Sequence, residues 1–186
     1  MTKPRIALIS GSTRGGSINK NLVSAMALVF KDLGVTPVKI DLNKYDMPIY
    51  NGDYEAANGV PKTAKNLIRR LKGCDGVFIA TPEYNGCMPA LLKNTIDWTT
   101  RVELGQFTGP IYSIGAATPG GLSGIMALKQ LHFILTRLGA NIVSSGLGVG
   151  FAGKAFDKKG RLADERTAAR AQAMAEKMLM EIKRRK

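Results

Sequence analysis

Short runs of consecutive apolar residues alternate along this chain with longer segments in which apolar residues recur every three or four positions. Unbroken short runs are typical of strands buried on both faces, whereas the longer spacing is typical of amphipathic helices. The runs predict five strands, over residues 5–10, 38–42, 76–81, 111–115 and 141–146. The helical spacing predicts five helices, over residues 17–34, 61–72, 89–100, 125–138 and 164–182.

Capping and turn residues support these boundaries. Ser17 and Asp164 are suited to the N-caps of helices, Gly34 to a helix end, and Pro61 to the first helical position. Residues 156–162 resemble a tight hairpin turn. Residues 43–60 are rich in Tyr, Asn, Gly and Asp and predict a long loop, a feature that is usually functional or mobile.

The alternation of strands and helices predicts the fold class. A chain of 186 residues argues for a single domain over residues 1–186. We expect an α/β fold in which helices cover both faces of one parallel sheet. Ligands bind outside the carboxyl ends of the strands in such sheets. Three polar loops that contain glycine, residues 11–17, 82–89 and 116–124, follow strands at that edge and predict the site.

The loop over residues 11–17 has the composition of a phosphate site. It joins a buried strand to a helix N-terminus, where backbone N–H groups favour an anion, and the guanidinium of Arg14 can donate two hydrogen bonds to phosphate oxygens. Gly11 and Gly16 have the spacing of a P-loop, but Ser17 replaces the lysine that an NTPase needs. Thr13 also breaks the dinucleotide pattern Gly-x-Gly-x-x-Gly. A terminal monophosphate, as in FMN, fits best, and an ordinary cap and turn is the alternative.

The loop after the third predicted strand suits a flat ligand. Gly86 lets the backbone approach closely, Tyr84 could cover a ring face, and Asn85 could hydrogen-bond a polar ring edge. Glu83 is as consistent with a solvated carboxylate as with a functional one. We expect Trp98, in the following helix, to be a core residue.

Two motifs together carry a family resemblance. The chain reads Gly11-Ser-Thr-Arg-x-x-Ser-x-Asn19 and, later, Pro82-Glu-Tyr-Asn-Gly86, followed by Pro89, Leu92-Lys-Asn94 and Ile96-Asp-Trp98. At this separation they resemble the NADPH-dependent FMN reductase family and, within it, the bacterial chromate and quinone reductases. The resemblance covers about the whole chain and implies a flavodoxin-like, doubly wound, five-stranded parallel sheet that binds FMN without a covalent bond.

The resemblance also implies where FMN lies. The phosphate would contact Ser12, Arg14, Ser17 and Asn19, and the isoalloxazine ring would rest against residues 82–86. Family members often have a hydroxyl in the third loop near the flavin, and since Ala117 offers none, Thr118 and backbone amides would serve. The candidate cofactor-binding residues are Ser12, Thr13, Arg14, Ser17, Ile18, Asn19, Pro82, Glu83, Tyr84, Asn85, Gly86, Ala117 and Thr118.

The charge of the chain is strongly basic, with 27 Lys and Arg against 14 Asp and Glu and a formal net charge of +13. Such a balance favours anionic partners such as nucleic acid, membrane surfaces or small anions. Residues 154–186 hold 11 basic and 5 acidic residues, and residues 61–72 hold five basic residues and no acid. The excess therefore lies on two helical segments, outside the three loops.

Cysteine and targeting signals are sparse. Cys74, Cys87 and the single His132 exclude a four-cysteine iron–sulfur site and disfavour structural zinc. No apolar stretch approaches the length of a membrane span, and the N-terminal run is too short for a signal peptide. We expect a reduced, cytoplasmic protein.

The expected activity is hydride transfer from NADPH or NADH by way of FMN to small acceptors: quinones, chromate, azo or nitro compounds, or free flavin. We expect no catalytic side chain, because the flavin carries the chemistry, and no metal. His132 is expected to be structural. The resemblance implies a homodimer or homotetramer, and we expect the stretch after the third predicted strand, including Asp97, Arg101 and Glu103, to form part of the contact. Two alternatives are an electron carrier of the flavodoxin type and, less favoured, a basic nucleic-acid-binding protein, for which no DNA- or RNA-binding motif is present.

Overall fold

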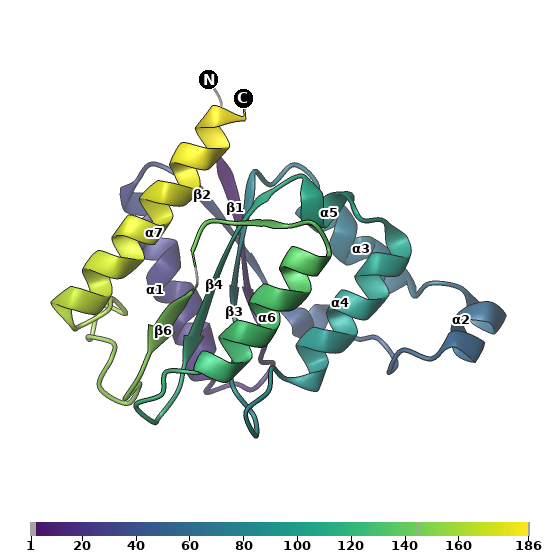
Figure 1. Ribbon diagram of the computed structural model, residues 1–186, viewed down its shortest axis with the longest axis horizontal. Coiled ribbons are helices and arrows are strands. Elements are labelled where there is room, and N and C mark those ends of the chain that lie inside the picture. Colours follow the sequence, from purple (N-terminus) through teal and green to yellow (C-terminus); the bar gives the residue numbers. More distant parts are fainter. Residues whose placement is uncertain (1–2, 145, 186) are drawn as a thin grey trace.

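The computed structural model describes residues 3–144 and 146–185 and has a parallel sheet at its centre (Figure 1). The strand order is β2-β1-β3-β4-β5, and β6 also pairs with β4. These strands pair with one another in parallel. This order is the flavodoxin-like form of a doubly wound sheet. The predicted fold class is therefore confirmed.

The strands lie close to the predicted runs. They are β1 (Arg5–Ser10), β2 (Thr36–Ile40), β3 (Gly76–Ala80), β4 (Ile111–Ala117), β5 (Asn141–Ile142) and β6 (Leu147–Val149). The second begins and ends two residues before the predicted range, since it is the edge strand, where Pro37 is tolerated. Of the predicted fifth strand over residues 141–146, only Asn141–Ile142 forms a strand among the described residues, and residue 145 lies outside them. Strand β6 lies beyond the predicted range. Ile111 pairs with Asn141 but Gly115 pairs with Leu147, a register that advances by two residues.

Helices cover both faces of the sheet, as its alternating side chains require. The helices are α1 (Ile18–Asp32), α2 (Gly52–Asn58), α3 (Lys62–Leu71), α4 (Ala90–Val102), α5 (Gly105–Thr108), α6 (Ile125–Arg137) and α7 (Glu165–Arg184). Ile6 and Leu8 of β1 face the apolar side chains of α1 and α7. Ala7 and Ile9 face those of α3, α4 and α6. The unbroken apolar strands of the sequence thus serve two separate cores.

The last part of the chain agrees with its predicted turn and cap. Phe156 and Leu162 form an antiparallel bridge that closes the hairpin turn. The side chain of Asp164 accepts hydrogen bonds from the N–H (2.7 Å) and the hydroxyl (2.6 Å) of Thr167, which lower the pKa of Asp164. Asp164 is therefore the N-cap of α7, as predicted.

The predicted loop over residues 43–60 is wrong in part, because it contains α2 and overlaps a 3-10 helix, Leu42–Lys44. Helix α2 has seven residues and buries none of them, so it has no apolar periodicity in the sequence. Polar contacts stabilise it instead. The Asn51 side chain caps its N-terminus by accepting from the N–H of Tyr54 (3.0 Å), and Arg101 of α4 forms an ion pair with Glu55 (2.8 Å). The same Arg101 contact lowers the pKa of Glu55.

Trp98 anchors this segment to the body of the molecule. Its side chain is fully buried, which confirms the expected core role, and its Nε1–H donates to the carbonyl of Pro48 (2.7 Å). The rings of Tyr50 and Tyr54 meet it edge-on, with centroids 5.0 and 6.0 Å away. One indole on α4 therefore positions a long surface segment.

Replacing this anchor tests its contribution. We expect Trp98→Ala to lower the free energy of unfolding by about 3–5 kcal/mol, because it leaves a large cavity and removes the contact with Pro48. Urea unfolding followed by circular dichroism measures this. Trp98→Phe keeps most of the packing and is the matched control, with a loss smaller than that of the alanine variant. A loss under about 1 kcal/mol for Trp98→Ala would show that the segment does not depend on Trp98.

Candidate functional site

The carboxyl ends of β1, β3 and β4 lie side by side. Ser10 is in register with Ala80, and Ala80 with Gly115. The pairing continues past the strands, since the N–H of Gly11 donates to Ala80 O and that of Thr81 to Gly115 O, both at 2.8 Å. The three loops predicted from the sequence therefore leave the sheet at one edge, the lower edge in Figure 1.

The first loop leaves its polar groups available. Ser17 is the N-cap residue of α1 and is buried, yet its side chain makes no capping hydrogen bond, and the first turn of α1 holds no acidic residue. Ser12 is also buried, and Arg14 is exposed, with Nη2 3.4 Å from Gly16 O. The partly buried Thr13 uses its carbonyl to accept from Lys20 Nζ (2.9 Å), and Ile18 begins the helix.

This donor set fits a phosphate. The first N–H groups of a helix have no partner within the helix, and here an uncommitted hydroxyl and an exposed guanidinium lie beside them. An acidic side chain in the first turn would repel an anion, and none is present. Ser12, Arg14 and Ser17 are the residues that would hold the terminal phosphate of FMN.

Asn19 has a different task in this structure. Its Nδ2 donates to the carbonyl of Ala117 (3.0 Å), and its Oδ1 accepts from the N–H of Ala117 (2.9 Å). The side chain is 2% exposed, so both bonds are shielded from water. Asn19 thus ties the start of α1 to the end of β4, and its direct contact with phosphate stays a prediction.

The second loop is a tight hairpin that projects from the edge. Tyr84 and Cys87 bond each other through both backbone pairs, at 2.9 and 3.0 Å. The intervening Asn85 and Gly86 have φ angles of 51° and 74°, the left-handed pair that an Asn-Gly hairpin turn requires. Pro82 is buried at the base, whereas Tyr84 is 54% exposed. The hairpin therefore offers an aromatic side chain and backbone to an incoming flat ring.

Glu83 is a capping residue, a role that the sequence does not show. Its Oε2 accepts from the N–H groups of Met126 (2.9 Å) and Ala127 (3.0 Å), at the start of α6. The N-cap position of α6 is Gly124, which has no side chain to do this. Gln130 of α6 accepts from the N–H of Met88 (3.0 Å) and donates to Cys87 Sγ (3.3 Å). The hairpin and α6 are therefore held together at both ends of the loop.

The third loop has fewer free amides than the sequence suggests. Ala117 is the last residue of β4, and its N–H is used by Asn19. The N–H of Thr118 donates to Val149 O (3.0 Å), and its hydroxyl donates to Gly120 O (3.1 Å). Contacts of Ala117 and Thr118 with a flavin stay a prediction, and the backbone amides of these two residues are already engaged.

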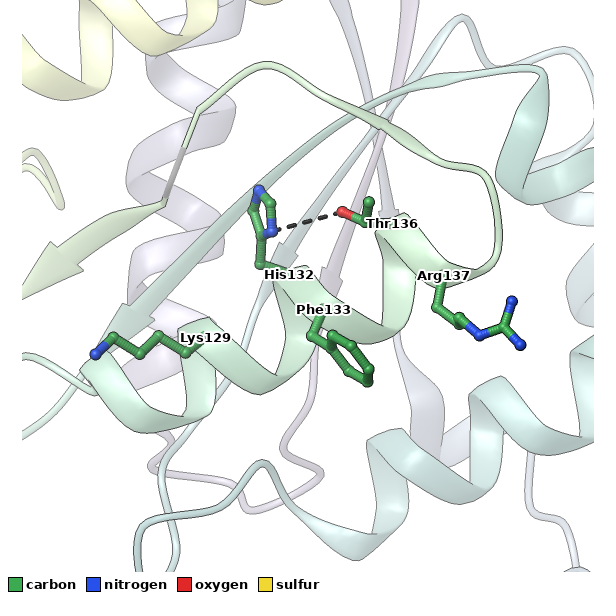
Figure 2. A pocket seen from close by; sticks show the side chains of 5 residues that line it. All are labelled: Lys129, His132, Phe133, Thr136 and Arg137. Atoms are coloured by element: carbon green, nitrogen blue, oxygen red, sulfur yellow. Dashed lines mark hydrogen bonds between the residues drawn. The ribbon is translucent and has the colours of Figure 1, made fainter.

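The outer face of α6 carries a separate, shallow hollow of about 490 Å³ (Figure 2). Lys129, His132, Phe133 and Arg137 line it, and Phe133 is 70% exposed. His132 Nδ1 lies 3.5 Å from the Thr136 hydroxyl, one helical turn away. His132 therefore lies on the side of a helix and not in one of the three loops. No helix in the described part of the chain is long and apolar enough to cross a membrane.

Comparisons with known proteins agree with this geometry. Residues 4–154 match the sequence profile of the family described as NADPH-dependent FMN reductase. A quinone reductase of Escherichia coli is 30% identical over 146 residues, 76% of this chain and 74% of that protein. An NAD(P)H-dependent FMN reductase of Pseudomonas aeruginosa is 29% identical over 95% of this chain and 94% of its own. The solved structure of FerB, a flavoenzyme NAD(P)H:(acceptor) oxidoreductase from Paracoccus denitrificans, superposes with a TM-score of 0.80 at 26% identity and covers 97% of this chain and 98% of its own.

The link between Asn19 and Ala117 can be tested by removing it. We expect Asn19→Ala to lower the free energy of unfolding by about 2–4 kcal/mol, because a buried N–H and a buried carbonyl both lose their partner. Asn21→Ala is the control, since Asn21 is exposed on the same helix. Urea unfolding of both variants gives the comparison. Equal stability of the two variants would show that the link contributes nothing.

Proposed function

Because the chain belongs to the NADPH-dependent FMN reductase family, which uses FMN with NAD(P)H as electron donor, we propose that it reduces quinones and other small acceptors. The observation that carries this proposal is the edge of the sheet where the three loops meet. On one side of it, α1 begins without a side-chain cap and without an acidic residue in its first turn. On the other side, the hairpin over residues 82–89 projects with Tyr84 exposed. One part suits a phosphate and the other a flat ring, and both belong to the same molecule, FMN.

The residues of the chain would hold and orient FMN. Bound FMN supplies the hydride chemistry. The Ser12 and Ser17 hydroxyls, the Arg14 guanidinium and the α1 N–H groups bind its phosphate in the proposed complex. The backbone of residues 82–86 lies along the ring, and Glu83 fixes that backbone by capping α6. No side chain is assigned as an acid or base.

NAD(P)H and the acceptor would bind in turn at the open side of the edge. Tyr84 is half-exposed there, and an open flavin face accepts chemically diverse partners. We therefore extend the proposed acceptors from quinones to chromate, azo and nitro compounds and free flavin. Electron carriers of the flavodoxin type are generally acidic, so the net charge of +13 argues against that alternative. A nucleic-acid-binding role has no support from the geometry of the loops.

We also propose that the chain forms a homodimer or homotetramer. Leu122, Ile125, Met126 and Phe133 are large apolar side chains left exposed along the third loop and α6, and such patches mark interaction surfaces. The contact first expected at Asp97, Arg101 and Glu103 has less support, because these residues pair within the chain with Lys93, Glu55 and Lys72. The cysteines, Cys74 and Cys87, are free, which supports a cytoplasmic location.

Steady-state kinetics tests the activity. The FMN-loaded protein should oxidise NADPH only when menadione is present, and reciprocal plots at several quinone concentrations should be parallel, since donor and acceptor bind in turn. Boiled protein and free FMN are the controls for uncatalysed transfer. Absence of quinone-dependent oxidation would overturn the proposal and favour the electron carrier.

The phosphate assignment can be tested separately from turnover. We expect Ser17→Ala and Arg14→Ala each to raise the Kd for FMN about 10-fold, because each removes a hydrogen bond to a charged group. Fluorescence quenching of FMN measures the affinity, and circular dichroism checks that the fold is intact. Asn21→Ala, on the exposed side of α1, should leave the Kd unchanged. Unaltered affinity in both loop variants would place the phosphate elsewhere.

A further inference from the structure

A basic hollow lies on the other side of the third loop from the hairpin. It has a volume of about 620 Å³ and is lined by the third loop, the end of β6 and the first turns of α7. The start of α7 and the end of β6 are at the same edge of the sheet as the three loops (Figure 1). The hollow therefore lies beside the proposed flavin site without being part of it.

Three cations line this hollow, and one of them, Arg166, lies near enough to Asp164 to help lower the pKa of that carboxyl. Lys154, Arg166 and Arg170 make no side-chain hydrogen bond or ion pair within the described residues. Asp164 is the acid of the lining, and its carboxylate is committed to the cap of α7. By contrast, the nearby Arg161 is paired with Asp32 (2.7 Å). An adjoining hollow of about 320 Å³ shares Arg170 and adds Lys129.

The third loop is tightly packed against residues 148–151, and both segments line the hollow. A Cβ on Gly150 would lie 2.8 Å from Ser123 Oγ, and the Phe151 ring lies against Gly121. Ser123 and Phe151 are non-glycine residues with positive φ, 57° and 48°, a conformation that is costly and tends to occur at functional sites. The third loop and residues 148–151 therefore form one unit, and a ligand in the hollow is held at a fixed place relative to the loop.

The hollow also offers an aromatic surface. Phe151 lines it and is 70% exposed, so its ring is accessible to a ligand. A purine base can stack on an aromatic ring, while guanidinium groups bind phosphate in a bidentate fashion. An aromatic ring next to these three cations suits an adenine nucleotide with a phosphate monoester.

We propose that this hollow binds the adenosine 2′-phosphate end of NADPH, an inference that rests on the proposed reductase function. NADPH carries its nicotinamide ring and its 2′-phosphate at opposite ends. When the nicotinamide lies at the flavin loops, the site for the 2′-phosphate therefore lies beside those loops. Arg166, Arg170 and Lys154 bind the 2′-phosphate, and Phe151 supports the adenine. NADH has a hydroxyl at the same position and gains nothing from the three cations, so the hollow selects NADPH.

Binding of nucleotide fragments tests the site without turnover. Calorimetry of the FMN-loaded protein should give a Kd for adenosine 2′,5′-bisphosphate that is about 10-fold lower than that for 5′-AMP, and Arg170→Ala should raise the former about 10-fold. Arg184→Ala is the matched control, since Arg184 lies at the far end of α7 and pairs with Glu181. Equal affinity for the two nucleotides would overturn the proposal. So would inorganic phosphate that displaces adenosine 2′,5′-bisphosphate as well as the unlabelled nucleotide does at the same ionic strength, or an Arg184→Ala variant that loses as much affinity for it as Arg170→Ala.

Turnover separates this inference from the function on which it rests. In Arg170→Ala the KM for NADPH should rise about 10-fold while kcat and the KM for NADH stay unchanged. A wild-type protein that oxidises neither nucleotide refutes the reductase function, and the fragment measurement then still decides the hollow. If the wild-type protein oxidises both NADPH and NADH, and Arg170→Ala leaves the ratio of their KM values unchanged, the reductase function stands and the proposed NADPH site is refuted.

Discussion

The proposed site depends on the alignment of three neighbouring strands whose carboxyl ends lie at the same edge of the sheet. Register between β1, β3 and β4 brings Ser10, Ala80 and Gly115 into one row. β1 and β3 end at this row, β4 ends two residues later at Ala117, and each strand then leads into one of the three loops. Loops that meet in this way must be fixed by contacts that leave the space for a ligand open. The Asn19 side chain does so by bonding both backbone groups of Ala117, and Glu83 does so by capping α6. Hydroxyls and aromatic surface are left over for a ligand.

The parallel sheet, the two-faced core and the three loops could be predicted from the sequence pattern, because unbroken apolar runs followed by glycine-bearing loops are typical of a parallel sheet. The flavodoxin-like form of that sheet was implied only by the family resemblance. Helix α2 could not be predicted, since it buries no residue and is held by contacts of Tyr54 with Trp98 and of Glu55 with Arg101, far away in the chain. Strand β6 was not predicted either, because the polar and glycine residues at 144–146 interrupt the apolar residues and the predicted strand ends there.

The roles of individual site residues were harder to predict than their location. Glu83 and Asn19 belong to motifs that suggest ligand contact, yet the side chains of both hydrogen-bond to the backbone of another element. A sequence shows which side chains lie near an edge but not which backbone groups there lack partners. Ser17 is the reverse case: it occupies a capping position, and its hydroxyl is not used as a cap. Charge behaves similarly, since only the fold shows that Lys154, Arg166 and Arg170 surround one hollow.

The absorption spectrum of the purified protein under anaerobic conditions tests the central claim, that the three loops hold FMN for hydride transfer, most directly. After loading with FMN and gel filtration, the account predicts bands near about 370 and 450 nm that bleach when NADPH is added and return when a quinone follows. Protein that leaves the column colourless, or whose bands persist in excess NADPH, would contradict it.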